Sequence, residues 1–145
     1  MELERSTSAV YEIAYHVVWC PKYRKNLPET VQGHAKTVIR TICEARGWEI
    51  RAMEVMPDHI HLFIGARPID SPVAIIKALK GISAKVLFES HPYLRRTFRK
   101  GHLWSPSYYI GTVGHVSEET VARYVRDQKL RAQGRTVERR PSSPQ

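Results

Sequence analysis

Alternating apolar and polar residues predict four strands. The first covers residues 9–20, where Trp19 lies on one face and His16 on the other. The remaining three strands are expected over residues 48–55, 59–65 and 107–113. Only a short turn built on Pro57 and Asp58 separates the second strand from the third, so these two strands are expected to pair as a hairpin.

A helical period of apolar residues predicts three helices. The first spans residues 28–46 and stops at Gly47. The second spans residues 71–90, begins with a Ser-Pro start signal and keeps Lys80 away from its apolar stripe. The third is capped by Ser117 and carries carboxylates in its first turn, where they complement the helix dipole.

The order of these elements predicts an α+β fold of the ferredoxin-like (split βαβ) type. One antiparallel sheet would carry two helices on a single face, followed by a C-terminal helix. A single domain is expected over residues 1–131, and the polar, basic residues 132–145 are expected to form a disordered tail. If the apolar residues of the third strand face the two helices, its polar side faces open space.

Charge separates this chain from an ordinary globular domain. Its 145 residues include 42% hydrophobic residues, but the formal net charge is +9 and the pI is near 9.8. This excess favours nucleic acid or an anionic membrane surface as partner. No transmembrane run and no signal peptide are evident, so a cytoplasmic location is expected. Cys20 and Cys43 lack metal-type spacing and are interpreted as reduced, buried residues.

The third predicted strand opens with His59-Ile60-His61. Residues two apart on a strand share a face, so the two imidazoles would lie about 7 Å apart and could converge on one ion. The same pattern is compatible with two half-exposed side chains that bind nothing. Asp58 is interpreted as a turn residue in preference to an outer partner of the metal site, and His16 could join that site.

The last predicted helix carries Tyr124 and Gln128, which are neighbours on one helical face. A tyrosine can act as a covalent nucleophile, and an amide oxygen can complete a metal site begun by imidazoles. Alone, this spacing is also typical of ordinary packing on an amphipathic helix.

Two basic segments contain interleaved aromatic residues, a composition suited to phosphates and stacked bases. The candidate DNA contacts are Lys22, Tyr23, Arg24, Lys25, Arg95, Arg96, Arg99, Lys100 and Trp104.

Several motifs together resemble a known family. The chain is similar to the IS200/IS605 transposases, single-domain members of the HUH single-tyrosine nucleases, from about Tyr11 to Gln128. The resemblance is carried by the His59-Ile60-His61 motif, by Tyr124 with Gln128, and by the segments YHVVWCPKYR (15–24) and LWSPSYY (103–109).

The resemblance implies a metal-dependent transposase that nicks and rejoins single-stranded DNA at hairpin-marked element ends. Tyr124 would attack the scissile phosphate and form a 5′-phosphotyrosine intermediate. His59, His61 and Gln128 would hold one Mg²⁺ or Mn²⁺ ion. The resemblance also implies a homodimer in which the tyrosine helix can act in trans, with Gly111 and Gly114 as a flexible link. Simple turn chemistry explains these glycines equally well.

Three alternatives stay open from the sequence. A domesticated relative acting on dispersed palindromic repeats would share the chemistry, and another HUH class, a replication initiator or relaxase, would usually have a longer chain. A non-catalytic nucleic-acid-binding module is the third, because a ferredoxin-like sheet is also an RNA-recognition scaffold.

Overall fold

The computed structural model describes residues 4–5, 10–112 and 118–134 of the chain. The strands are β1 (Glu4–Arg5), β2 (Val10–Tyr11), β3 (Ala14–Trp19), β4 (Glu49–Met56), β5 (His59–Gly65) and β6 (Tyr109–Gly111). The α-helices are α1 (Glu29–Arg46), α2 (Pro72–Ser90), α3 (Leu94–Thr97) and α4 (Glu118–Ala132), and two 3-10 turns are η1 (Lys22–Arg24) and η2 (Arg99–Gly101).

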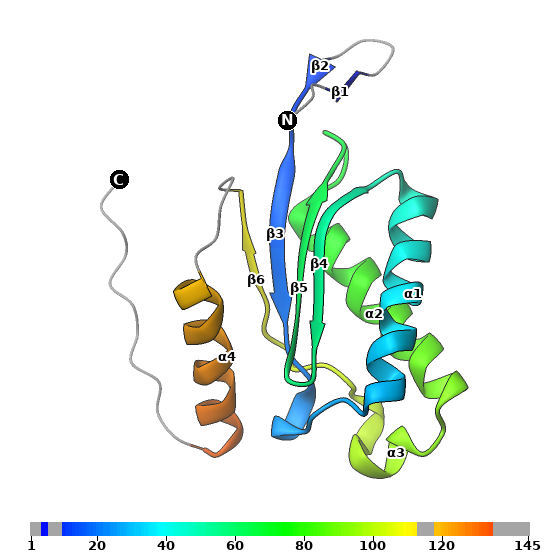
Figure 1. The fold of residues 1–145 in the computed structure, drawn as a ribbon, viewed down its shortest axis with the longest axis vertical. Helices are drawn as coiled ribbons and strands as arrows, with labels where there is room; N and C mark the ends of the chain where they lie inside the picture. Colours follow the sequence, from blue (N-terminus) through cyan, green and yellow to red (C-terminus); the bar gives the residue numbers. More distant parts are fainter. Residues whose placement is uncertain (1–3, 6–9, 113–117, 135–145) are drawn as a thin grey trace.

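Strands β3 to β6 form one antiparallel sheet in the order β4-β5-β3-β6, with α1 following β3 and α2 following β5 (Figure 1). This confirms the predicted ferredoxin-like arrangement. In the central pair, Val17 of β3 lies opposite Leu62 of β5, and Trp19 lies opposite Ile60. Because directly opposed residues share a face, these pairs make one face of the sheet apolar.

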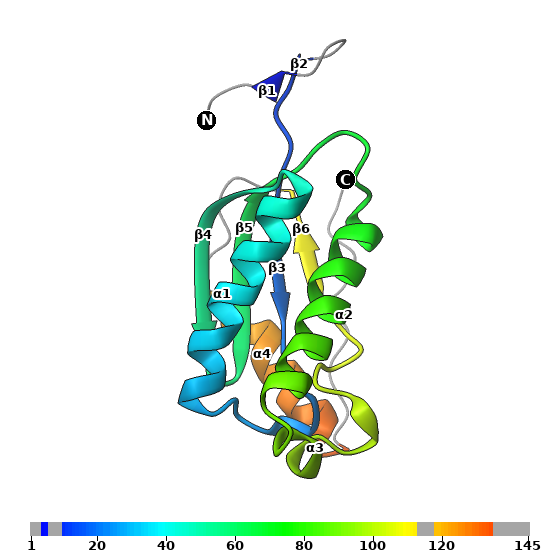
Figure 2. The same cartoon turned by 90° about the vertical axis from the view of Figure 1, so that its right-hand side faces the viewer.

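Helices α1 and α2 cover this apolar face (Figure 2). Ile60, Leu62 and Ile64 are all 0% exposed. Ile39 of α1 and Leu79 of α2 are buried in the same cluster. Burying a side chain of this size contributes about 1.5–3 kcal/mol, so this layer holds most of the hydrophobic stabilisation.

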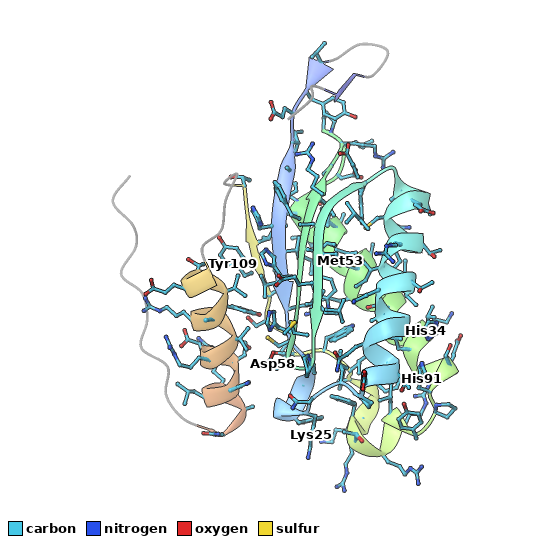
Figure 3. All side chains as sticks on the ribbon, in the orientation of Figure 1. Lys25, His34, Met53, Asp58, His91 and Tyr109 are labelled. Atoms are coloured by element: carbon cyan, nitrogen blue, oxygen red, sulfur yellow. The ribbon has the colours of Figure 1, made fainter. Side chains whose placement is uncertain are left out.

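The two long helices end as the sequence predicts. The Ser71 hydroxyl accepts a hydrogen bond from the Ala74 amide at 3.1 Å, which caps α2. Gly47 ends α1 in the left-handed conformation at φ 71°. The helices are also joined side to side, since His34 Nδ1 lies 3.0 Å from His91 Nε2 (Figure 3).

Helix α4 lies on the opposite face of the sheet, so the molecule has three layers: α4, the sheet, and the pair α1 and α2 (Figures 1 and 2). On this face His59 and His61 are half-buried, while the intervening Ile60 points into the core. The predicted orientation of β5 is therefore confirmed. Its polar side faces the last helix.

The predicted first strand is interrupted. β3 begins at Ala14 because its partner β5 ends at Gly65, directly opposite. The residues before it belong to β2, which pairs with β1 in a separate two-stranded sheet. The alternation over residues 9–20 therefore spans two strands, and residues 4–5 pair with the first of them.

The C-terminal third also differs in detail from the prediction. β6 covers three residues only, so Ser107 precedes the strand that was expected to begin there. The predicted cap Ser117 and Gly114 fall outside the described residues, as does the predicted tail beyond Gly134. None of the described helices is long and apolar enough to span a membrane.

Candidate active site

The β4–β5 hairpin positions the first motif histidine. Asp58 in the turn accepts a hydrogen bond from His59 Nδ1 at 2.8 Å. A carboxylate only accepts, so the proton of His59 sits on Nδ1 and the lone pair lies on Nε2. No hydrogen bond from a described residue occupies that Nε2. Asp58 is therefore both a turn residue and the partner that orients His59, where the sequence favoured the turn role alone.

The second motif histidine contacts β3. His61 Nε2 lies 3.1 Å from His16 Nδ1, so one ring donates to the other. His16 is buried and stacks flat on Phe63, with ring centroids 4.0 Å apart. Burial lowers the pKa of His61 below its ordinary value of 6.5, and the nearby His16 and His59 lower this pKa further. His61 is thus neutral near pH 7, the form that binds metal ions.

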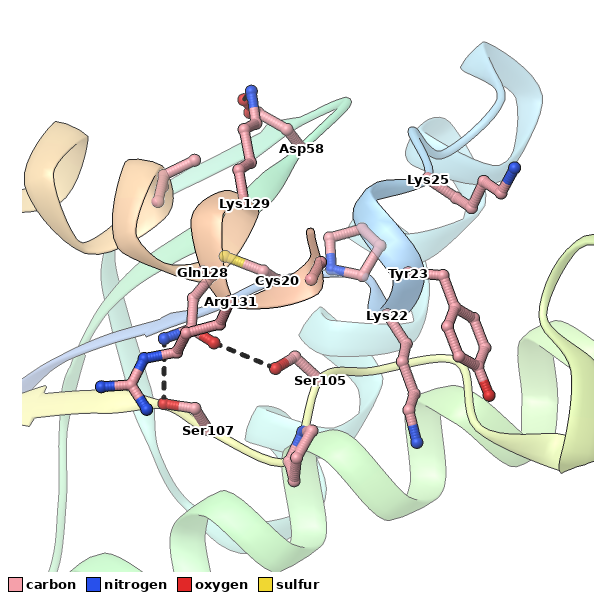
Figure 4. A pocket seen from close by; sticks show the side chains of 14 residues that line it. Cys20, Lys22, Tyr23, Lys25, Asp58, Ser105, Ser107, Gln128, Lys129 and Arg131 are labelled. Atoms are coloured by element: carbon pink, nitrogen blue, oxygen red, sulfur yellow. Dashed lines mark hydrogen bonds and ion pairs between the residues drawn. The ribbon is translucent and has the colours of Figure 1, made fainter. Parts of the chain in front are cut away.

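Tyr124 and Gln128 point from α4 toward the segment before β6. The Tyr124 hydroxyl donates to Ser107 Oγ at 3.2 Å, and the Gln128 amide nitrogen donates to the same oxygen at 3.3 Å. The Ser105 hydroxyl donates to Gln128 Oε1 at 3.1 Å (Figure 4). Two serines therefore fix both functional side chains of α4. The ring of Tyr109, on β6, lies 6.5 Å from that of Tyr124.

Burial raises the pKa of Tyr124 far above its ordinary value of 10.0, and the hydrogen bond to Ser107 opposes this only in part. The phenol is therefore protonated at neutral pH. It must lose its proton as it attacks an electrophile, and the serine that accepts its hydrogen bond is not a base at neutral pH.

Lys80 of α2 anchors the two serines. Its Nζ donates to the carbonyl oxygens of Ser105 and Ser107 at 2.7 and 3.3 Å. Burial lowers the pKa of Lys80. The sequence placed this lysine away from the apolar stripe, which is correct, but it is half-buried under the segment that positions Tyr124 and Gln128.

A second contact joins α4 to the hairpin turn. Lys129 Nζ lies 2.7 Å from Asp58 Oδ2, and the other carboxylate oxygen contacts His59. Burial by itself raises the pKa of Asp58, but the hydrogen bonds from Lys129 and His59 outweigh burial and keep this pKa below the ordinary value of 3.8. Figure 3 shows Asp58 at the tip of the hairpin, beside α4.

A cavity of about 270 Å³ lies between η1, the serine segment and α4 (Figure 4). Its lining residues include Lys22, Tyr23, Lys25, Asp58, Ser105, Ser107, Gln128, Lys129 and Arg131, and Cys20 forms part of its wall. Burial raises the pKa of the Cys20 thiol to about 12, so this thiol is neutral. The cavity is lined by Gln128 but by neither motif histidine nor Tyr124, so it lies beside most of the predicted site residues and does not contain them.

A second hollow of about 530 Å³ shares Tyr23 and Lys25 with the first. Its other lining residues are Arg96, Thr97, Arg99 and Lys100. The structure therefore brings the two predicted basic segments together, and the Tyr23 hydroxyl donates to the Arg99 carbonyl oxygen at 3.4 Å. Tyr23 and Lys100 both adopt left-handed backbone conformations, at φ 61° and 62°.

Most of the predicted DNA contacts are accessible. Tyr23, Lys25, Arg95, Arg96, Arg99 and Lys100 are exposed, and Lys22 is half-buried with its Nζ 5.2 Å from the centre of the Tyr23 ring. The Arg24 side chain lies outside the described part of the structure. These residues remain predicted DNA contacts.

Two predictions about individual residues are wrong, one for Trp104 as a DNA contact and one for Gly111 as a flexible link. Trp104 is only 6% exposed; its indole donates to Ser83 Oγ at 3.0 Å and meets Trp19 edge-on, so its ring is not available to a base. Gly111 does not act as a flexible link, because it is paired with His16 within the sheet. A Cβ at Gly111 would lie 2.6 Å from the Tyr109 hydroxyl, so a larger residue there would require the Tyr109 side chain to move.

The predicted metal ligands His59, His61 and Gln128 offer nitrogen and oxygen donors, and imidazole nitrogen suits Mn²⁺ better than Mg²⁺. Among the described residues, no group of three His, Cys, Asp or Glu side chains could hold a metal. Gln128 stays the predicted third ligand, and in the structure its amide oxygen accepts the hydrogen bond from Ser105 at 3.1 Å. No described residue hydrogen-bonds the lone pair of His59 Nε2. Its other ring nitrogen, Nδ1, donates to Asp58, and metal-bound histidines usually have such a partner on the nitrogen that does not bind the metal.

Sequence patterns missed several residues of this site. Ser105, Ser107, Lys80 and Lys129 carry no motif of their own, and their roles appear only when distant segments come together. His16 lies on the face that the alternation of its strand predicts, and the sequence analysis noted that it could join the site without including it among the site residues. Its position opposite the histidine motif on one sheet face is the signal that could have identified it.

Comparison with known proteins agrees with this geometry. A family model described as "Transposase IS200 like" matches residues 9–128. The ISDra2 transposase TnpA of Deinococcus radiodurans is 38% identical over 129 residues, which cover 88% of this chain and 92% of that protein. The transposase for insertion sequence element IS200 of Salmonella typhimurium is 33% identical over 101 residues, which cover 69% and 66% of the two chains.

Solved structures support the same relationship. A crystal structure assigned as a transposase from Deinococcus radiodurans R1 has a TM-score of 0.79 and 36% identity, covering 86% of this chain and 97% of that chain. A REP-associated tyrosine transposase bound to a REP hairpin has a TM-score of 0.52 and 15% identity, covering 88% and 74%, and shows the fold alone. The family predicted from the motifs is confirmed: the chain belongs to the IS200-like transposases of the IS200/IS605 family.

Proposed function

We propose that this transposase nicks and rejoins single-stranded DNA at hairpin-marked element ends, with Tyr124 as the nucleophile. The observation that carries the proposal is the pairing of the Tyr124 hydroxyl and the Gln128 amide on one serine, Ser107, at 3.2 and 3.3 Å. This arrangement places a potential nucleophile beside a metal-type donor on the helix that covers the His59 and His61 face.

The reaction conserves phosphodiester bonds. The Tyr124 oxygen would form a bond to the scissile phosphorus and lose its proton to solvent, while the bond from phosphorus to the 3′-oxygen breaks and that oxygen takes a proton from solvent. The products are a 5′-phosphotyrosine and a free 3′-hydroxyl. A later 3′-hydroxyl would attack the same phosphorus, form the new DNA strand and release Tyr124. No nucleotide cofactor is needed, because each bond broken is replaced by an equivalent bond.

His59, His61 and Gln128 are the residues that would hold Mg²⁺ or Mn²⁺. When bound, such an ion polarises a non-bridging phosphate oxygen and stabilises the developing charge. Mg²⁺ prefers oxygen ligands, whereas imidazole also suits Mn²⁺. We therefore expect Mn²⁺ to support the reaction at least as well as Mg²⁺.

The two cationic hollows support a DNA partner. They share Tyr23 and Lys25 and reach from Gln128 to Lys100, so lysine and arginine side chains line both hollows beside α4. The REP-associated relative was solved with a REP hairpin, and we extend hairpin binding to this chain as part of the proposal.

A homodimer is also part of the proposal, with the tyrosine helix acting in cis or in trans. Helix α4 contacts Ser107, and the cis and trans arrangements differ in which chain supplies this helix. Mixing Tyr124→Phe chains with His59→Ala chains separates the two, because activity recovers only if the helix of one chain serves the sheet of the other.

The decisive experiment is incubation of the protein with labelled single-stranded DNA from the boundaries of its own locus and Mn²⁺ or Mg²⁺. We expect a DNA adduct that survives SDS and is absent with Tyr124→Phe, with His59→Ala, with EDTA or with duplex DNA. Tight hairpin binding without any adduct would contradict the proposal and favour a non-catalytic DNA-binding protein. An adduct on dispersed palindromic repeats, but not on element ends, would indicate a domesticated relative.

A further inference from the structure

Helix α4 has few fully buried apolar side chains and several polar contacts with the rest of the chain. Among its described side chains only Val125 is buried, so hydrophobic burial fixes this helix far less than it fixes α1 and α2. Its polar attachments include the serine contacts of Tyr124 and Gln128 and the ion pair between Lys129 and Asp58. Each polar contact therefore has a large share in positioning the helix.

The ion pair is not confined to the surface of α4. One oxygen of Asp58 contacts Lys129 Nζ at 2.7 Å, and the other contacts His59 Nδ1 at 2.8 Å. A single carboxylate thus joins the helix that carries Tyr124 to a histidine of the motif. Lys129 directly follows Gln128 in the sequence. The turn of α4 that would supply Gln128 as a metal ligand therefore also contacts Asp58, the hydrogen-bond partner of His59.

We propose that Lys129 and Asp58 are positioning residues that couple the docking of α4 to the orientation of His59. When α4 is docked, Lys129 holds the carboxylate so that Asp58 keeps the His59 proton on Nδ1 and its lone pair on Nε2. When α4 leaves, Asp58 loses this restraint and His59 is less well oriented toward a metal ion. The metal part of this inference rests on the proposed function.

Coupling of this kind is reciprocal. If docking of α4 raises metal affinity, metal binding must favour the docked helix by the same factor. Loss of an outer partner of a metal-bound histidine typically weakens metal affinity by about 10–100-fold. Lys129 acts one step further out and is partly exposed, so we expect a smaller factor, about 3–10-fold.

The test must separate Lys129 from the ligand next to it. The comparison is therefore made in a Gln128→Ala variant, in which α4 supplies no ligand. Electron paramagnetic resonance measures the Mn²⁺ affinity of this variant and of the double variant that also carries Lys129→Met. We expect the added substitution to weaken Mn²⁺ binding by about 3–10-fold. Lys129→Arg should restore the affinity, because the cation is retained. Arg126→Met removes an exposed cation from the same helix and should leave the affinity unchanged.

A second readout does not require metal. Nitrogen-15 NMR of His59 should show the Nδ1–H form in the wild-type chain, and a mixture of the two neutral forms in Asp58→Ala and, to a lesser degree, in Lys129→Met. Unchanged metal affinity and an unchanged His59 tautomer in Lys129→Met would overturn the coupling, as would an equal loss of affinity in Arg126→Met. Failure of the wild-type chain to form a DNA adduct, with the Lys129 effects intact, would overturn the proposed function alone.

Discussion

The two faces of the sheet are built by different interactions. The face covered by α1 and α2 buries branched apolar side chains such as Leu62 and Ile39 completely. On the face covered by α4, two histidines contact each other, and a tyrosine and a glutamine of α4 hydrogen-bond to a serine before β6. Alternate residues of β5 point to opposite faces of the sheet. One face therefore contributes most of the hydrophobic stabilisation, and the other holds the residues of the candidate site.

The largest expected difference is between neighbouring residues of β5. Leu62→Ala should lower the free energy of unfolding by about 2–5 kcal/mol, because it leaves a cavity in the packed layer. His61→Ala should cost only about 0.5–1.5 kcal/mol, since it loses a hydrogen bond on the other face, yet it should abolish the DNA adduct. Urea unfolding and the adduct assay measure the two effects. Equal destabilisation by both substitutions would contradict the division of labour.

Lys80 crosses between the layers and should show an intermediate effect. Lys80→Met keeps the aliphatic stem but removes the cation that holds the Ser105 and Ser107 carbonyls. We expect a loss of about 1–3 kcal/mol in stability and slower adduct formation. The exposed Lys77 lies one turn earlier on α2, and Lys77→Met is the matched control. If Lys77→Met slowed adduct formation as much as Lys80→Met, the contacts of Lys80 with the serine carbonyls would not be the cause of the effect.

Acid should loosen the α4 layer before it affects the apolar layer. The pKa of Asp58 is lowered in the folded chain, so its stabilising contribution is present above its unfolded pKa, about 3.9. That contribution is lost as the pH falls through the lower folded pKa. NMR signals of α4 should therefore weaken below about pH 4 while those of α1 persist. In Asp58→Asn the acid dependence of the α4 signals should be reduced.

The smallest expected effects concern the basic rim. Replacing both Arg96 and Lys100 by Gln should reduce the slope of log affinity against log salt by about 0.7 for each phosphate of single-stranded DNA that is no longer neutralised. Adduct formation at saturating DNA should be unchanged. Lys36→Gln, on the exposed side of α1, is the control and should leave the slope as it is. An unchanged slope in the double variant would show that the DNA does not contact Arg96 and Lys100.

Local periodicity was sufficient to predict the layers. The alternation in β5 placed His59 and His61 on the face opposite Ile60 and Leu62, and capping residues marked the end of α1 and the start of α2. The interruption before Ala14 was not predictable in this way, because it depends on where the partner strand ends. The alternation of apolar and polar residues continues between β2 and β3. The period of one strand does not reveal where its partner strand ends.

The contacts of the candidate site were only partly predictable. His59, His61, Tyr124 and Gln128 were identified through motifs whose order in the chain is characteristic of the family. Trp104 was misassigned because its basic surroundings in the sequence do not reveal that its ring packs against Trp19. The Lys129 contact with Asp58 joins a hairpin turn to the last helix, and only the folded chain brings these segments together.

The left-handed backbone at Tyr23 and Lys100 has a consequence for engineering. A non-glycine residue in this conformation costs about 1–2 kcal/mol relative to one that adopts it freely, and both residues line the same hollow. Glycine at either position would relax the backbone but remove an aromatic ring or a cation from the rim. A search for thermostable variants would therefore select against the groups proposed to hold DNA, and a more heat-resistant form of this transposase could be a weaker binder.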